Sequence, residues 1–311
     1  GQKHVGSLRF AWYCSLRIFA RYAGVIHIRE VSMKKLVAVF LILLFTLPVF
    51  ADDSISLGTS KSLESKTMAE NRPYMVYLPP SYGTSEKTYP VIYLLDGDIH
   101  RFKGFVGVLE SLSTETLGNQ VQEAIVIAIP NTNRSRDLTP SSLIEWKFKG
   151  RVLETFEQTG NAKQFAKFLE EELIPAVDTS YRTSKKRVLV GESFGGLFAA
   201  NTLIESPSVF TDYLIIDPTS LWDNDYLNRA VNAGNKDIKF NSRVYFAFAN
   251  NSHLGDIGLT NYEWGSTFAS SVIDNNDAIS EQQFFENETH GNVAFLAWYN
   301  GLKTLMSTTE H

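Results

Sequence analysis

The chain has 311 residues, of which 44% are apolar and 20% are charged, with 20 glycines and 10 prolines. This composition is typical of a globular protein and excludes collagen-like, disulfide-scaffold and largely disordered chains. The first 51 residues carry 7 Lys and Arg against 1 acid, which leaves 22 basic and 33 acidic residues, a net charge of −11, for residues 52–311. An acidic body without a basic stripe argues against a nucleic acid partner.

Residues 33–51 have the pattern of a secretory signal. A positive start at residues 33–35 is followed by an apolar run over 36–50 and a small-residue exit at Ala51. The run is shorter than the about 20 residues of a membrane span, although a buried helix or an uncleaved anchor remains an alternative. We therefore expect a periplasmic or secreted protein with no stable membrane span after signal cleavage. Residues 1–32 precede this complete signal and are expected to be an upstream extension outside the fold.

The only cysteine of the chain is Cys14. Residues 52–311 therefore contain no thiol, which excludes cysteine catalysis, thiolate zinc sites and disulfides from this part of the chain. The absence of cysteine also suits an oxidising compartment.

From residue 52 onward, short apolar runs bounded by turn residues alternate with helical patterns. The runs are typical of strands buried on both faces of a parallel sheet, and they cover residues 74–78, 91–95, 124–129, 187–190, 213–216 and 244–249. Helical spacing is found over 161–177, 194–204 and 292–306. Residues 52–311 are therefore predicted to form one doubly wound α/β domain with a mostly parallel sheet and helices on both faces. Residues 131–155 lack a clear period and are expected to be a long connection that shapes a site.

The hexapeptide GESFGG at residues 191–196 fits the pattern G-x-S-x-G. A predicted strand enters the motif and a predicted helix leaves it, which is the setting of a nucleophile elbow. The glycines permit a tight turn, and the amide of Phe194 at the helix start points where an oxyanion would form. We therefore predict that Ser193 is a catalytic nucleophile. The alternative is a glycine-rich turn that Ser193 only caps.

A serine hydroxyl needs a base to take its proton, and after such an elbow the histidine comes late in the chain. His290, just before the final predicted helix, is the predicted base, with His253 as the alternative.

The sequence offers more than one candidate for the acid that orients this histidine. Asp256 is the first carboxylate after the strand that ends at Ala249 and is the predicted choice. Asp217, at the end of the preceding strand, and a serine–histidine dyad without an acid remain open.

An oxyanion hole needs a second amide beside that of Phe194, and the turn after an earlier strand usually supplies it. Here that turn is Asp96-Gly97-Asp98, and we predict that the amide of Gly97 or Asp98 faces the nucleophile. The competing interpretation of the two acids is a cation site. No further acid or histidine spacing supports that interpretation, so neither a metal nor a cofactor is expected.

Together these motifs resemble the Putative esterase family of α/β-hydrolases, which includes enterochelin-type siderophore esterases and esterase D-like enzymes. The resemblance runs over about residues 72–302, and its landmarks are residues 77–82, 93–98, 131–132, 136–140, 171–175, 191–196 and 288–291. It implies a single-domain α/β-hydrolase fold and a serine carboxylesterase with Ser193 and His290 as nucleophile and base. Where relatives often carry an acid, this chain has Asn250 and Asn251, which leaves the third member of the triad open.

We therefore expect an exported serine carboxylesterase that hydrolyses small or short-acyl esters through an acyl-enzyme on Ser193. The alternatives are an esterase for siderophores or sugar esters, a peptidase or thioesterase with the same residues, and a catalytically silent binding module. Trp146 and Phe148 are expected to line the pocket. Arg134 and Arg136 either bind an anionic substrate or are paired at the surface. The expected partner is a small-molecule ester, and the sequence leaves the oligomeric state open.

Overall fold

The structure is a computed structural model that describes residues 56–114, 116, 119–233 and 239–308. The expected signal at 33–51 and the expected extension at 1–32 lie outside the described residues, so both stay predictions. Within the described ranges, no helix is both long enough and apolar enough to cross a membrane.

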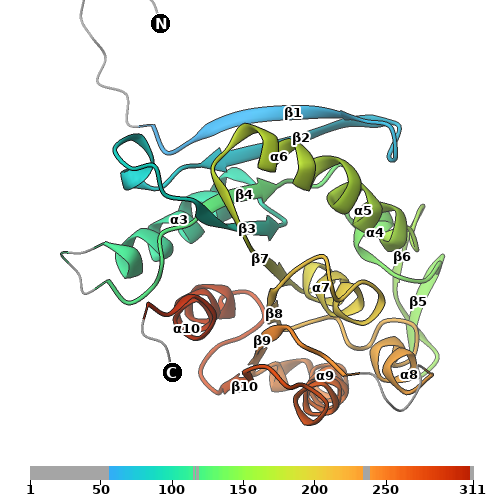
Figure 1. Ribbon diagram of the computed structural model, residues 1–311. Helices are drawn as coiled ribbons and strands as arrows, with labels where there is room; N and C mark the ends of the chain where they lie inside the picture. Colours follow the sequence, from blue (N-terminus) through green and yellow to red (C-terminus); the bar gives the residue numbers. More distant parts are fainter. Residues whose placement is uncertain (1–55, 115, 117–118, 234–238, 309–311) are drawn as a thin grey trace, which may run out of the picture. The chain divides into compact units, whose positions relative to one another are not determined.

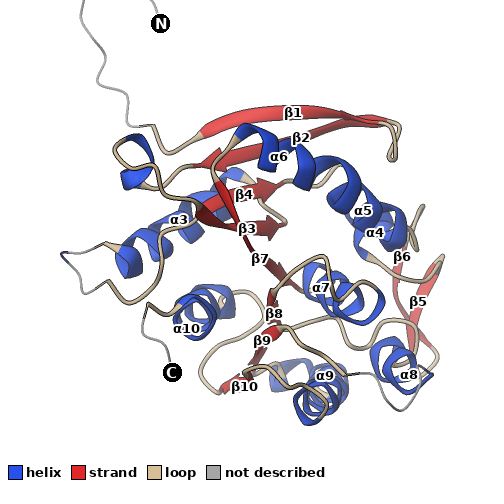
Figure 2. Ribbon diagram, viewed as in Figure 1, coloured by secondary structure: helices blue, strands red, loops and turns tan. Residues whose placement is uncertain are grey.

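An eight-stranded, mostly parallel sheet forms the centre of the described chain (Figures 1 and 2), in the order β1-β2-β4-β3-β7-β8-β9-β10. Its strands are β1 (Thr59–Ser65), β2 (Glu70–Tyr77), β3 (Tyr89–Leu95), β4 (Ile125–Ile129), β7 (Thr183–Glu192), β8 (Asp212–Ile216), β9 (Arg243–Ala249) and β10 (Ser280–Phe285). The β1–β2 and β2–β4 pairs are antiparallel, and the other five pairs are parallel. The predicted α/β class is confirmed.

Helices cover both faces of this sheet and close two separate hydrophobic cores. One core is covered by α5 (Ala162–Phe168), the π-helical turn η3 (Leu169–Leu173), α6 (Ile174–Ser180), α7 (Phe194–Glu205), α8 (Tyr226–Ala233) and α9 (Asp256–Asp274). The other is covered by α3 (Ile99–Ser113) and α10 (Val293–Met306). Along β3, Tyr93 and Leu95 enter the first core whereas Ile92 and Leu94 enter the second, as the two-residue period of a strand requires.

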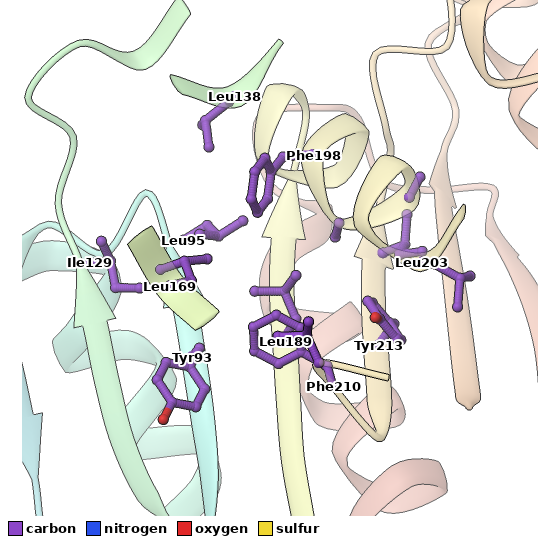
Figure 3. Packing of buried hydrophobic residues seen from close by; sticks show 14 of the residues in the cluster. Tyr93, Leu95, Ile129, Leu138, Leu169, Leu189, Phe198, Leu203, Phe210 and Tyr213 are labelled. Atoms are coloured by element: carbon purple, nitrogen blue, oxygen red, sulfur yellow. The ribbon is translucent and has the colours of Figure 1, made fainter. Parts of the chain in front are cut away.

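Figure 3 shows part of the first core, in which Leu95 of β3, Leu189 of β7 and Phe198 of α7 belong to one packed cluster. Leu189 and Phe198 are fully buried, and burial of such side chains contributes about 1.5–3 kcal/mol each. Because β7 and α7 both pack into this core, the turn that joins them is held in place.

Several elements of the fold are not predicted by the sequence pattern. The segment 131–155 contains the short helix α4 (Arg134–Leu138) and a hairpin of β5 (Glu145–Phe148) and β6 (Arg151–Thr155). Helix α9 lacks a strong apolar stripe because part of its buried face is glycine: a Cβ on Gly265 would lie 2.7 Å from Ser220 Oγ. The edge strand β1 is almost entirely exposed, so its polar sequence carries no alternating pattern.

Candidate active site

Ser193 stands at a sharp turn between β7 and α7, with φ 59° and ψ −120°. A positive φ is strained for a residue with a Cβ, so the surrounding structure must enforce it. The turn is crowded: a Cβ on Gly191 would lie 2.1 Å from Gly195 O, and one on Gly196 would lie 2.8 Å from Ile216 O. The strand–turn–helix setting predicted for Ser193 is therefore present, and its glycines are required by close backbone approach.

His290 lies in the loop between β10 and α10, and its Nδ1 is 2.5 Å from Asp217 Oδ2. Asp217 directly follows β8, its side chain is fully buried, and its Oδ1 also accepts a hydrogen bond from the Ala249 amide at 3.3 Å. The ring of His290 is about half exposed. With Nδ1 bound to a fixed carboxylate, Nε2 is the nitrogen left to accept a proton.

The predicted acid, Asp256, does not take this position. It is the first residue of α9, its side chain is 70% exposed, and it pairs with Lys149 at 2.6 Å. The carboxylate bound to His290 is instead Asp217, the alternative from the preceding strand. The alternative base, His253, is exposed in the short 3₁₀ turn Ser252–Leu254.

The environment of His290 shifts its titration. Its pKa is raised above the ordinary 6.5 chiefly by the hydrogen bond to Asp217, while partial burial lowers the pKa and offsets part of this effect. The negative charge of Glu192 raises this pKa further and the positive charge of Arg134 lowers it. The balance favours the imidazolium that forms when the histidine accepts a proton.

Ser193 and His290 line one cavity of about 260 Å³. Its other lining residues are Arg134, Trp146, Glu154, Phe194, Asp217, Thr219, Leu221, Asn251, Leu254, Ile257, Gly258 and Asn261. The Ser193 hydroxyl lies 3.3 Å from Thr219 Oγ1, and within the described part of the chain it has no hydrogen bond to His290. Such contacts are often long without substrate and tighten in the reacting complex.

The predicted oxyanion donors are only partly supported by the geometry. The amide of Gly97 donates to Ile129 O at 3.0 Å and that of Asp98 donates to Asp96 O at 2.8 Å. Both amides therefore already have backbone acceptors, and their role as oxyanion donors stays a prediction. The Gly97 amide is engaged because the turn after β3 closes onto the end of β4, whereas the Asp98 amide bonds within the turn itself. The amide of Phe194 is in the first turn of α7, where amides have no acceptor within the helix.

The two arginines of the long connection are both paired. Arg134 binds Asp96 through two hydrogen bonds of 2.7 and 2.9 Å, and Arg136 pairs with Glu70 at 2.7 Å and with Asp137 at 2.6 Å. The hydrogen bond from Arg136 is the main cause that holds the pKa of Glu70 at about 2, with further hydrogen bonds from Thr132 and Arg72. Arg134 nevertheless lines the cavity, whereas Arg136 does not. Trp146 also lines it, and Phe148, expected beside it, instead lies under the Lys149 ammonium group.

The acids after β3 are likewise committed to other partners. The carboxylate of Asp98 caps α3 by accepting the amides of His100 and Arg101 at 2.8 and 2.9 Å, and that of Asp96 pairs with Arg134. Among the residues that the structure describes, no group of three or more His, Cys, Asp or Glu is arranged to hold a metal ion.

In the sequence, Asn251 stands out only because it lies where relatives often carry an acid. Its side chain is buried and contacts both Asp217 and His290. Thr219 was not singled out at all, although it contacts the Ser193 hydroxyl. The one indication in the sequence is that Thr219 comes two residues after Asp217, at the end of a predicted strand.

A mostly parallel sheet, a serine at a strand–helix elbow and a histidine bound to a buried carboxylate define the architecture of an α/β-hydrolase. The family described as "Putative esterase" matches residues 65–266. The chain belongs to this family.

Two curated relatives have names that describe siderophore esterases. The chain is 29% identical over 170 residues to the ferri-bacillibactin esterase BesA of Bacillus subtilis strain 168, covering 51% of this chain and 57% of the relative. It is 33% identical over 162 residues to the siderophore enterobactin esterase of Emericella nidulans, covering 46% and 50%. The chain thus spans about half the length of these relatives.

Solved structures extend the likeness over most of the chain. An IroE-like serine hydrolase from Shewanella oneidensis superimposes with a TM-score of 0.71 and 31% identity, covering 79% of each chain. The BES protein from Bacillus cereus superimposes with a TM-score of 0.66 at 22% identity, covering 82% of this chain and 98% of that one, and supports the fold alone.

Proposed function

We propose that this protein hydrolyses carboxylic esters through an acyl-enzyme on Ser193. The Ser193 hydroxyl attacks the ester carbonyl while His290 Nε2 accepts its proton and returns it to the leaving alcohol. Asp217 holds Nδ1 and stabilises the imidazolium. The amide of Phe194 donates to the oxyanion of the tetrahedral intermediate. Water then attacks the acyl-enzyme by the same route in reverse and releases the acid, and no step needs a cofactor.

The observation that carries this proposal is the 2.5 Å contact between His290 Nδ1 and Asp217 Oδ2 on the cavity that Ser193 also lines. Burying a carboxylate without partners is costly, and this fully buried one has the histidine ring as a partner. Perturbed titratable groups that face a cavity with a nucleophile are typical of catalytic sites.

The size and walls of the cavity favour a small reacting group. Its volume of about 260 Å³ lies just below the range of about 300–1,000 Å³ typical of sites that enclose a ligand. Trp146, Leu221 and Ile257 give it apolar walls. We therefore propose short-acyl or single-aryl esters as the groups that enter. The names of the relatives support siderophore esters as the natural class, with the rest of such a molecule outside the cavity.

The test is hydrolysis of p-nitrophenyl acetate, butyrate, octanoate and palmitate, and of enterobactin with and without iron. We expect turnover concentrated on the short esters, and a loss of at least about 10³-fold in both Ser193→Ala and His290→Ala. Activity that survives in Ser193→Ala contradicts the mechanism. No turnover of any ester, together with no labelling by a fluorophosphonate, favours a catalytically silent binding module.

We also propose that the protein is exported, on the support of the signal pattern at residues 33–51. Expression with the complete chain in a bacterial host, followed by fractionation and mass spectrometry, is expected to yield a periplasmic or secreted protein that begins at Asp52. A cytoplasmic protein that keeps residues 33–51 contradicts this proposal.

A further inference from the structure

The side chain of Asn251 joins the acid and the histidine of the site. Its Nδ2 donates to Asp217 Oδ2 at 2.8 Å, and its Oδ1 accepts the backbone amide of His290 at 2.9 Å. The residue is only 6% exposed. The Nδ2 end of this amide group therefore binds the same carboxylate oxygen that contacts His290 Nδ1. Its Oδ1 end binds the backbone of His290 itself.

The segment around Asn251 is held from both sides. The first turn of α9 packs directly on it, since a Cβ on Gly258 would lie 1.9 Å from the Asn251 carbonyl oxygen. The amide of Asn250 donates to Glu288 O at 2.7 Å, which ties the loop that carries His290 to the end of β9. Asn251 is thus fixed in place and has little freedom to turn away from its two partners.

We infer that Asn251 is a positioning residue, whose side-chain amide fixes the Asp217 carboxylate and the His290 backbone in one geometry. The inference deepens the proposed function and rests on it. The site has its acid at the end of β8, and Asn251 lies after β9, where the sequence predicts the acid. From there it acts through Asp217 and His290 and does not touch the reacting atoms.

The chemistry of the position explains why an amide serves better than a carboxylate. Asn offers a donor and an acceptor on one flat group, which match the carboxylate oxygen and the backbone amide. An aspartate at this position would place a second carboxylate oxygen about 2.8 Å from Asp217 Oδ2. Two carboxylates this close repel each other, and the pKa of one of them is raised.

The experiment compares Asn251→Leu and Asn251→Asp with matched changes at Asn250. Asn250 is the same residue type next in the chain, but its side chain bonds to Glu286 O and to the Ser252 amide instead. For Asn251→Leu, which removes both hydrogen bonds at similar volume, we expect kcat to fall about 100-fold, as a misplaced catalytic group does, with KM changed less than about threefold. Asn250→Leu and Asn250→Asp are expected to stay within about threefold of the parent protein.

The pH dependence separates positioning from a general loss of structure. The charged groups that face His290 are Asp217, Glu192 and Arg134, and none of them is altered in these variants. Loss of the bridge in Asn251→Leu loosens the Asp217 contact, so the acid limb of the kcat profile moves to lower pH. The added carboxylate in Asn251→Asp favours the imidazolium and moves the limb to higher pH. The Asn250 variants keep the parent profile.

Titration of labelled histidine by NMR, with His290 assigned through His290→Ala, measures the same shifts without turnover. A protein that neither hydrolyses esters nor labels at Ser193 defeats the proposed function, yet the NMR titration still tests the bridge. The inference is overturned if Asn251→Leu keeps parental kcat and the parental His290 titration. It is also overturned if the two Asn251 variants shift the titration in the same direction, or if the Asn250 variants shift it equally.

Discussion

Replacement of Asp217 by Asn, beside the same change at Asp256, separates the acid found in the structure from the acid predicted from the sequence. The Asp217 carboxylate is fully buried and lies 2.5 Å from His290 Nδ1. In Asp217→Asn the amide can present a donor to Nδ1, which leaves the proton on Nε2, where it blocks acceptance of the serine proton. A wrong tautomer of this kind lowers kcat by about 10⁴-fold, which corresponds to about 5 kcal/mol of transition-state stabilisation.

Asp256 provides the control because its carboxylate is 70% exposed and its partner Lys149 is 63% exposed. Exposed pairs of this kind contribute little, so Asp256→Asn is expected to change kcat/KM by less than about twofold. The assay is hydrolysis of p-nitrophenyl butyrate at pH 7.5, with circular dichroism to show that both variants are folded. A large loss in Asp256→Asn with near-parental activity in Asp217→Asn would refute the assignment.

Three further predictions follow from the charges and the backbone. The acid limb of kcat/KM is expected above pH 6.5, because the base is neutral His290 and Asp217 raises its pKa above that value; a pH–rate profile with the limb below pH 6 contradicts this. Glu70→Gln is expected to lose about 1 kcal/mol of stability at pH 7 after solvent screening. In urea unfolding this difference shrinks below pH 4.5 and is lost as the pH falls through about 2, because the lowered pKa of Glu70 stabilises the fold only while the group is ionised. A difference independent of pH counts against this prediction. Gly191→Ala, whose Cβ would lie 2.1 Å from a backbone oxygen, is expected to lower the melting temperature by more than about 10 °C. An unchanged melting temperature would contradict the claim that the turn around Ser193 has no room for a Cβ at this position.

The strands were predictable wherever both faces of the sheet are covered. Strands β3, β4, β8 and β9 are continuous apolar runs because one set of side chains enters each core. The edge strand β1 and helix α9 were not predictable by pattern. The first is exposed along most of its length, and part of the second is buried through glycines, whose contacts depend on what other segments bring near them.

Some residues of the site could likewise be predicted from the sequence, and others could not. Ser193 and His290 were predicted from a local motif and from chain order, and the structure brings both to one cavity. Asp217 ranked behind Asp256 because chain order favours the later strand, and only the fold shows that Asn251 fills the space beside the histidine. The hydrogen bond of the Gly97 amide depends on how the turn after β3 meets β4, which no sequence spacing reveals.

The central claim is that Ser193 is an activated nucleophile, and covalent labelling tests it most directly. The parent protein, Ser193→Ala and His290→Ala are incubated with a fluorophosphonate and digested, and the modified peptide is located by tandem mass spectrometry. We predict one adduct per chain on Ser193 in the parent protein, none in Ser193→Ala, and labelling slowed by at least about 10³-fold in His290→Ala. An adduct at another residue, or none on the folded parent protein, would contradict the claim.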